Sequence, residues 1–66
     1  MIRIDHQFVS ILRFKKILRV GVSEIHIAMK TNNIIISGED LYIYSFNKDE
    51  VIIQGHIKKV EFDERL

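Results

Sequence analysis

Most aliphatic residues of this chain are branched at Cβ: thirteen Ile and five Val stand against four Leu and one Ala. Such side chains lose rotamer freedom in a helix and pack well on the pleated surface of a sheet. Ile25 and Ile27 alternate with polar residues, and Leu41 and Ile43 alternate with two tyrosines. A period of two indicates strands with one buried and one solvated face. The sequence therefore predicts an all-β fold.

Polar turns divide the chain into about seven short strands, which we expect at 7–14, 16–20, 23–30, 33–37, 41–46, 50–54 and 56–62. In 66 residues these strands form a single small domain over 1–66, with an N-terminal extension at 1–6 and a polar tail at 63–66. The segment 7–20 can also be drawn as an amphipathic helix. Its β-branched content and the lack of a preceding helix cap favour strands.

Three glycines, Gly21, Gly38 and Gly55, are 17 residues apart, and the apolar runs before the last two match each other. One interpretation is a small antiparallel roll or sandwich whose strands bend at the glycines. The other is a short β-solenoid with a 17-residue period. Turns of two to four residues favour antiparallel neighbours. In both cases we expect Gly38 and Gly55 at bends, with the positive φ that glycine adopts at little cost.

The alternation also predicts which side chains form the core. We expect most of it from Ile34, Ile36, Leu41, Ile43, Val51, Ile53, Ile57, Val60 and Phe62. Ile35 and Ile52 break the alternation, so we expect them to be partly exposed and available to a partner.

No residue pattern points to catalysis, and we predict no catalytic, metal or cofactor-binding residue. The chain has no cysteine, its three histidines are widely separated, and its acids lie next to one another in turns. It also lacks an apolar run of about 18 residues, the length of a membrane span, and the start of a signal peptide. We therefore expect a soluble, intracellular protein that is not an enzyme.

Charge is distributed unevenly along the chain. Residues 1–30 carry six basic and two acidic side chains, and residues 31–66 carry four basic and seven acidic ones. The cluster that could bind an anionic partner consists of Arg13, Lys15, Lys16 and Arg19. Such residues neutralise phosphates of a membrane or a nucleic acid, although a solvated strand face has the same composition. A single interleaved aromatic, Phe14, makes nucleic acid the weaker of the two partners.

The stretch 33–62 has an apolar run, a glycine, Leu-x-Ile, a polar turn, a second apolar run, Gly-x-Ile and a final Val-Glu-Phe. In this pattern the chain resembles the core of the YabP/YqfC family of sporulation proteins. The motif positions, to which the resemblance assigns structural roles, are Gly38, Leu41, Ile43, Gly55, Ile57 and Phe62. Upstream, Lys15-Lys16-Ile17-Leu18 is similar to a lysine-x-isoleucine-leucine turn of the YqfC side of the family. Asn32-Asn33 departs from the pattern, because the family often has a glycine there.

The resemblance implies a non-enzymatic protein of the mother cell of an endospore former, with no cofactor and no small-molecule substrate. It implies a structural, assembly or interaction role in the cytoplasm, with a peripheral position at a membrane surface. As partners we expect a second copy or another sporulation protein, including a membrane-associated one, because short strands leave sheet edges open. For self-association we expect the acidic half of one chain beside residues 13–19 of the next. The alternative is a small β-barrel that binds nucleic acid through residues 13–19.

Overall fold

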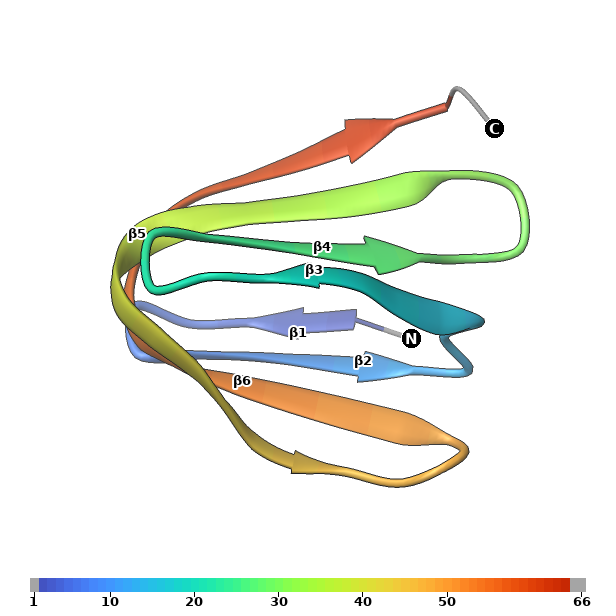
Figure 1. Ribbon diagram of the computed structural model, residues 1–66, viewed down its shortest axis with the longest axis horizontal. Coiled ribbons are helices and arrows are strands. Elements are labelled where there is room, and N and C mark those ends of the chain that lie inside the picture. Colours follow the sequence, from blue (N-terminus) through green and yellow to red (C-terminus); the bar gives the residue numbers. More distant parts are fainter. Residues whose placement is uncertain (1, 65–66) are drawn as a thin grey trace.

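Six antiparallel strands form one open sheet in the computed structural model, which describes residues 2–64 (Figure 1). Their order across the sheet is β1-β2-β6-β5-β4-β3. The strands are β1 (Ile2–Ile4), β2 (Phe8–Leu12), β3 (Lys16–Val20), β4 (Glu24–Ala28), β5 (Asn33–Phe46) and β6 (Glu50–Asp63). The predicted all-β class is confirmed. The solenoid is wrong, because every pair of neighbouring strands is antiparallel.

The strands differ from the prediction in their number as well as in their ends. The strands expected at 33–37 and 41–46 form the single strand β5, and those expected at 50–54 and 56–62 form β6. Each is 14 residues long, and the two keep pairing with each other through a bend. The segment expected as an N-terminal extension contains β1, which pairs Ile4 with Val9 of β2. The segment 7–20 forms strands rather than a helix, as its composition favours, and Arg13 turns between them with a φ of 62°. Of the expected polar tail, Asp63 belongs to β6, and residues 65–66 lie outside the described part.

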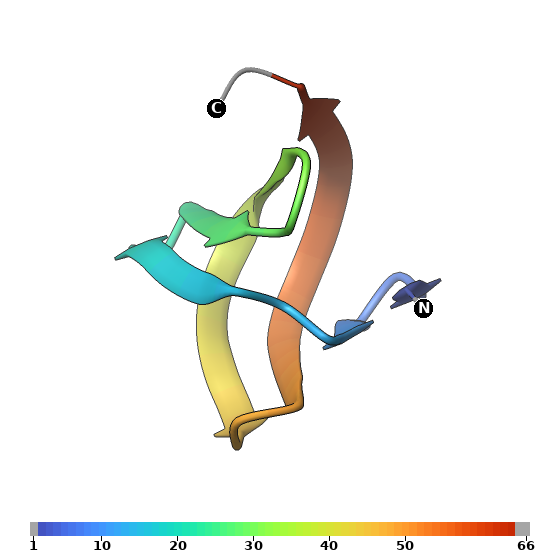
Figure 2. The same cartoon turned by 90° about the vertical axis from the view of Figure 1, so that its right-hand side faces the viewer.

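The bent pair of β5 and β6 folds the sheet into two layers of four strands. Layer A contains β3, β4, the first half of β5 and the second half of β6. Layer B contains β1, β2, the first half of β6 and the second half of β5. In Figure 1 layer A occupies the upper half of the picture and layer B the lower half, and Figure 2 shows the curvature of the two long strands that join them. The small antiparallel roll or sandwich is therefore the observed architecture.

The core lies between the layers. Its buried members, which are at most 3% exposed, are Val9, Ile11, Ile25, Ile27, Ile34, Ile36, Leu41, Val51 and Ile53. Five of them were predicted, whereas the contributions of β2 and β4 were not. Ile43, Ile57 and Val60 pack against the cluster only in part. The prediction for Phe62 is wrong: its side chain faces inward but is 52% exposed, because it stands on the edge of its layer.

The two layers are related by an approximate two-fold symmetry. Positions in β2 and β4 correspond at an interval of 16 residues, as Val9 does to Ile25, and positions in β5 and β6 at an interval of 17, as Ile34 does to Val51. Equivalent backbone hydrogen bonds recur in both halves. They are Asp5 N–H to Phe8 O and Gly21 N–H to Glu24 O; Arg13 N–H to Asp49 O and Met29 N–H to Asn32 O; and Gly55 N–H to Gln7 O and Gly38 N–H to Ser23 O. The 17-residue spacing of Gly38 and Gly55 is thus a mark of symmetry between antiparallel strands.

Gly38 and Gly55 lie at the bends, as predicted, but for different reasons. Gly55 has a φ of 137°, which side chains rarely tolerate. Gly38 has no positive φ, so that part of the prediction is wrong; glycine is needed there because a Cβ would overlap the carbonyl oxygen of His56 in the neighbouring strand. In the β5 bend the positive φ belongs to Asp40, at 54°.

Candidate functional site

Among residues 2–64, His, Cys, Asp and Glu side chains form no group of three or more that could hold a metal ion. The histidines do not converge: His6 and His56 are exposed, and the Nε2 atom of His26 lies 3.0 Å from a carboxylate oxygen of Glu24. The same residues contain no helix with the length and apolar character needed to span a bilayer.

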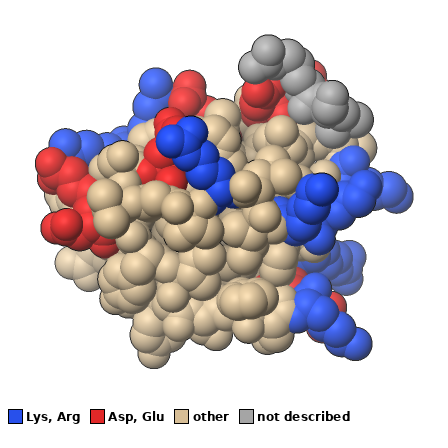
Figure 3. All heavy atoms as spheres, in the orientation of Figure 1, with Lys and Arg blue, Asp and Glu red and all other residues tan. Residues whose placement is uncertain are grey.

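The predicted basic cluster is divided by the fold. The backbone N–H of Arg13 donates to the carbonyl of Asp49 at 2.6 Å, and that of Lys15 donates to the carbonyl of Ala28 at 2.7 Å. These bonds hold the β2–β3 turn against the β5–β6 turn and the end of β4, at one end of the sandwich. Figure 3 shows Lys and Arg side chains gathered along the right-hand side of the molecule, where these turns lie. Arg19 points elsewhere, since its Nη1 atom is 3.9 Å from Glu24 Oε1 in β4.

Lys30 also lies at this end of the molecule. It is not in the basic cluster predicted from the sequence. A shallow surface depression is lined by Lys15, Lys16 and Lys30 around Leu18 and Met29. Lys30 belongs to the β4–β5 turn, so only the pairing of β3 with β4 brings it beside the β2–β3 turn. We call Arg13, Lys15, Lys16 and Lys30 the basic end. Phe14 is partly buried against the core, so its ring is turned away from a role in stacking on bases.

The apolar rows of both layers are buried in the middle and open at their ends. Each row crosses four strands, and its two central side chains are fully buried. The rows of layer A are Val20-Ile25-Ile36-Val60 and Ile17-Ile27-Ile34-Phe62. Those of layer B are Ile4-Val9-Ile53-Ile43 and Ile2-Ile11-Val51-Phe46. At the row ends Ile4, Val20, Phe46 and Phe62 are 54%, 55%, 62% and 52% exposed.

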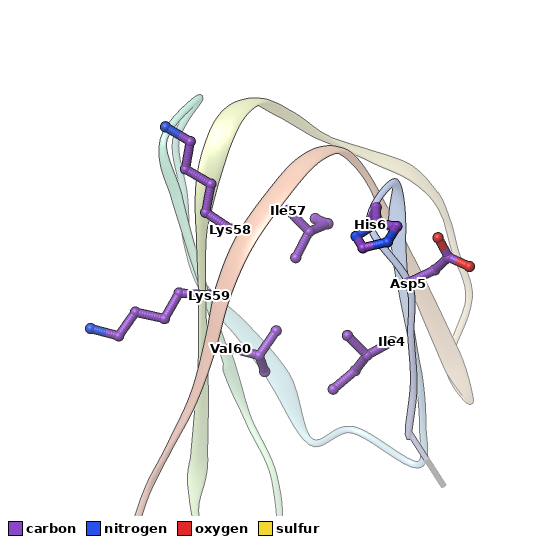
Figure 4. Close-up of a pocket in the computed structure, with 7 residues that line it drawn as sticks. All are labelled: Ile4, Asp5, His6, Ile57, Lys58, Lys59 and Val60. Carbon is purple, nitrogen blue, oxygen red and sulfur yellow. The ribbon is translucent and has the colours of Figure 1, made fainter.

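One of these openings is a cleft between β1 and the second half of β6, with a volume of about 430 Å³. In Figure 4 the side chains of Ile4, Ile57 and Val60 point toward one another across it, whereas Lys58 and Lys59 point away. The sequence did not indicate Ile4 as a surface residue of interest. Its only signal is the alternation of Ile2 and Ile4 about Arg3.

Backbone edges border the same openings. β1 and β3 end the sheet, and β2 pairs with β6 only between Glu50 and Gln54. Within residues 2–64, no strand pairs with the outer side of β6 beyond Ile57, or with the outer side of the second half of β5. Each layer therefore presents two strand edges whose N–H and C=O groups can pair with another chain.

The residues of the predicted family motif have identifiable structural positions. Gly38 and Gly55 form the bends, Leu41 is buried beside them, and Ile43 and Ile57 pack against the core in part. Phe62 stands on the open edge of layer A.

The model of one protein family, described as the YabP family, matches residues 4–66 of this chain. No curated protein matches this chain. The matched segment contains all six strands except the first two residues of β1.

Proposed function

Because the chain belongs to the YabP family, we propose that it is a non-enzymatic assembly module that acts in spore formation. Membership of this family fits a sporulation-related protein. We place its action in the mother cell, in the cytoplasm or at the surface of a membrane. Its partners are a second copy or another sporulation protein.

The observation that carries this proposal is the combination of open strand edges with half-exposed apolar side chains. Small β proteins that remain monomeric protect their edges with charges, prolines, bulges or covering segments. This chain has no proline, and Ile4 and Phe62 border the free edges of β1 and β6. Pairing with another strand would satisfy the backbone groups and cover the apolar row ends in one step.

The basic end supports a position at a membrane surface. Arg13, Lys15 and Lys30 lie in turns and Lys16 begins β3, all at one end of the sandwich, away from the bends near Gly38 and Gly55. Each basic residue near an anionic membrane contributes about 1 kcal/mol of attraction. An assembly could therefore rest on a membrane through its basic ends and still use its strand edges for pairing.

A complementation experiment in an endospore former tests the proposal. We expect a fluorescent fusion to collect in the mother cell, and the double variant Ile4→Lys with Phe62→Lys to lose assembly and most heat-resistant spores. Both positions are more than half exposed, so the variant should still fold. Val22→Lys, in the turn between β3 and β4, is the matched control. Full complementation by the double variant, or fluorescence confined to the forespore, would contradict the proposal.

Nucleic-acid binding is the second candidate, and the basic end is the observation that favours it. We expect only weak binding of a single-stranded oligonucleotide, with a Kd of about 100 µM or more at physiological salt, since phosphate contacts without stacking give non-specific affinity. Titrations at low and high salt with the Lys15→Glu, Lys16→Glu variant measure it, and Lys58→Glu is the control. Tight binding that depends on Lys15 and Lys16 would favour this candidate over assembly.

A further inference from the structure

We propose that copies of this protein add to one another sideways, with β3 of one copy pairing antiparallel to the second half of β6 of the next. This pairing rests on the proposed function and specifies its partner and its two surfaces. It extends layer A from four strands to eight, with the same cross-strand register on both sides of the junction.

The strand directions permit this addition when the next copy is turned to follow the ordinary twist of the sheet. Three antiparallel steps separate β3 from the second half of β6 across layer A, so the two edge strands of the layer are themselves antiparallel. A copy shifted sideways and turned to follow that twist therefore brings its β3 beside β6 in antiparallel orientation. Antiparallel pairing is also the more stable arrangement per residue.

The outward-facing rows of layer A end in opposite charges. These rows are Arg19-His26-Ile35-Glu61 and Lys16-Ala28-Asn33-Asp63. In the shifted copy, Arg19 stands directly beside Glu61 and Lys16 beside Asp63. Opposite charges facing each other across neighbouring strands stabilise the pair. The side chains of Arg19 and Glu61 are exposed, and their own contacts are surface ion pairs of 3.9 Å and 3.5 Å, which are weak enough to exchange.

The inward-facing rows are continuous across the same junction. Val60 meets Val20 of the next copy, and Phe62 meets Ile17. Val20 and Phe62 are more than half exposed at the open row ends, whereas Ile17 and Val60 are partly buried. The cleft beside Ile4 leaves space on the inner side of β6 for the arriving side chains. In this one register the backbone groups of the two edges can pair, the opposite charges face each other, and the apolar row ends cover each other.

The other edges lack this complementarity. The equivalent row of layer B is Arg3-Ser10-Ile52-Ser45, which ends in a neutral residue. Pairing β3 with a second β3 would place cations such as Arg19 and Lys16 side by side, at an energetic cost. The β3 edge carries a bulge between Ile17 and Arg19, so β6 of the next copy has to accommodate its extra residue as β4 does within the chain. Because β3 and β6 are opposite edges, their contact is head-to-tail and continues into an open filament.

Engineered disulfides test the register directly, because the chain has no cysteine. Mixing the Val20→Cys and Val60→Cys variants under mild oxidation should give a cross-linked dimer, and the chain with both substitutions should give a ladder of oligomers. Within one copy the two positions are three strand spacings apart, about 14 Å, which is too far for a disulfide. The matched control is the symmetry-related pair Ile4→Cys with Ile43→Cys in layer B, which should stay uncross-linked. Cross-linking confined to the control pair, or none in either mixture, would overturn the proposal.

Charge exchange provides a second measurement on the folded protein. We expect Arg19→Glu and Glu61→Arg each to weaken self-association in sedimentation equilibrium by about tenfold at low salt, and less at high salt. The chain with both substitutions should recover the original association, whereas Arg3→Glu, the symmetry-related control, should leave it unchanged. Failure of the double variant to recover contradicts the register.

The two proposals fail in distinguishable ways. A monomeric protein whose edge variants still abolish spore formation would overturn this pairing and leave the assembly role to a different partner. A cross-linking copy whose edge variants form normal spores would preserve the pairing and overturn the role.

Discussion

Replacing Gly38 by alanine is expected to lower the free energy of unfolding by about 3 kcal/mol, at the upper end of the usual range for overpacked sites. The added Cβ would overlap the carbonyl oxygen of His56, a backbone atom of the adjacent strand. That atom cannot move without disturbing the β5–β6 ladder at the bend where Gly38 pairs with Ile57. For a domain of this size the loss is a large fraction of the total stability. Urea unfolding followed by circular dichroism measures it.

Gly21 provides the control, because its nearest neighbour for a Cβ is the carbonyl oxygen of Glu24 at 3.2 Å. Gly21→Ala should therefore cost about 1 kcal/mol or less. Gly55→Ala should resemble the Gly38 variant, since it combines a φ of 137° with the carbonyl oxygen of Asp40 at 2.6 Å. Equal unfolding midpoints for the Gly21 and Gly38 variants would refute the close-approach argument.

The second large effect is expected for Ile53→Ala, which should cost about 3 kcal/mol by removing a fully buried side chain and leaving a cavity. Ile53 is at the centre of a row, between Val9 in β2 and Ile43 in β5. The neighbouring Ile52 points to the outer face and is half-buried, so Ile52→Ala should cost about 1 kcal/mol. Thermal or urea unfolding of both variants makes the comparison. Similar losses at the two positions would show that the core is not confined to the space between the layers.

The all-β class could be predicted from residues such as Ile25 and Ile27. Alternation of apolar and polar side chains is a property of each strand alone, so it can be read without knowing how the strands pair. Strand length did not follow. A glycine within an apolar run marks a bend, but Gly38 and Gly55 do not reveal whether the hydrogen-bond ladder stops there or continues around it. The matching runs before the two glycines indicated a repeat. Only the pairing of β5 with β6 shows that the repeats are antiparallel and related by a two-fold axis.

The candidate surfaces, too, could be predicted from the sequence only in part. Arg13, Lys15 and Lys16 could be grouped from their spacing, whereas Lys30 joins them only through the pairing of β3 with β4. Alternation places Phe62 on the inward side of its strand, which is the observed orientation. Alternation does not reveal that, among residues 2–64, no strand lies beyond β6 at this point to cover the ring.

The two-fold symmetry of the layers does not extend to the order in which they can form. β4 docks on β5 across the short turn at 29–32, whereas β2 docks on β6 across most of the chain, as in the hydrogen bond from Ser10 Oγ to Glu50 Oε2, 40 residues apart. Closing the larger loop costs more chain entropy, and such long-range pairings slow folding. During synthesis the β1–β2 hairpin must wait until β6 has been made. The two symmetry-related hairpins therefore differ in kinetics: β3–β4 can dock on β5 early, and β1–β2 docks last.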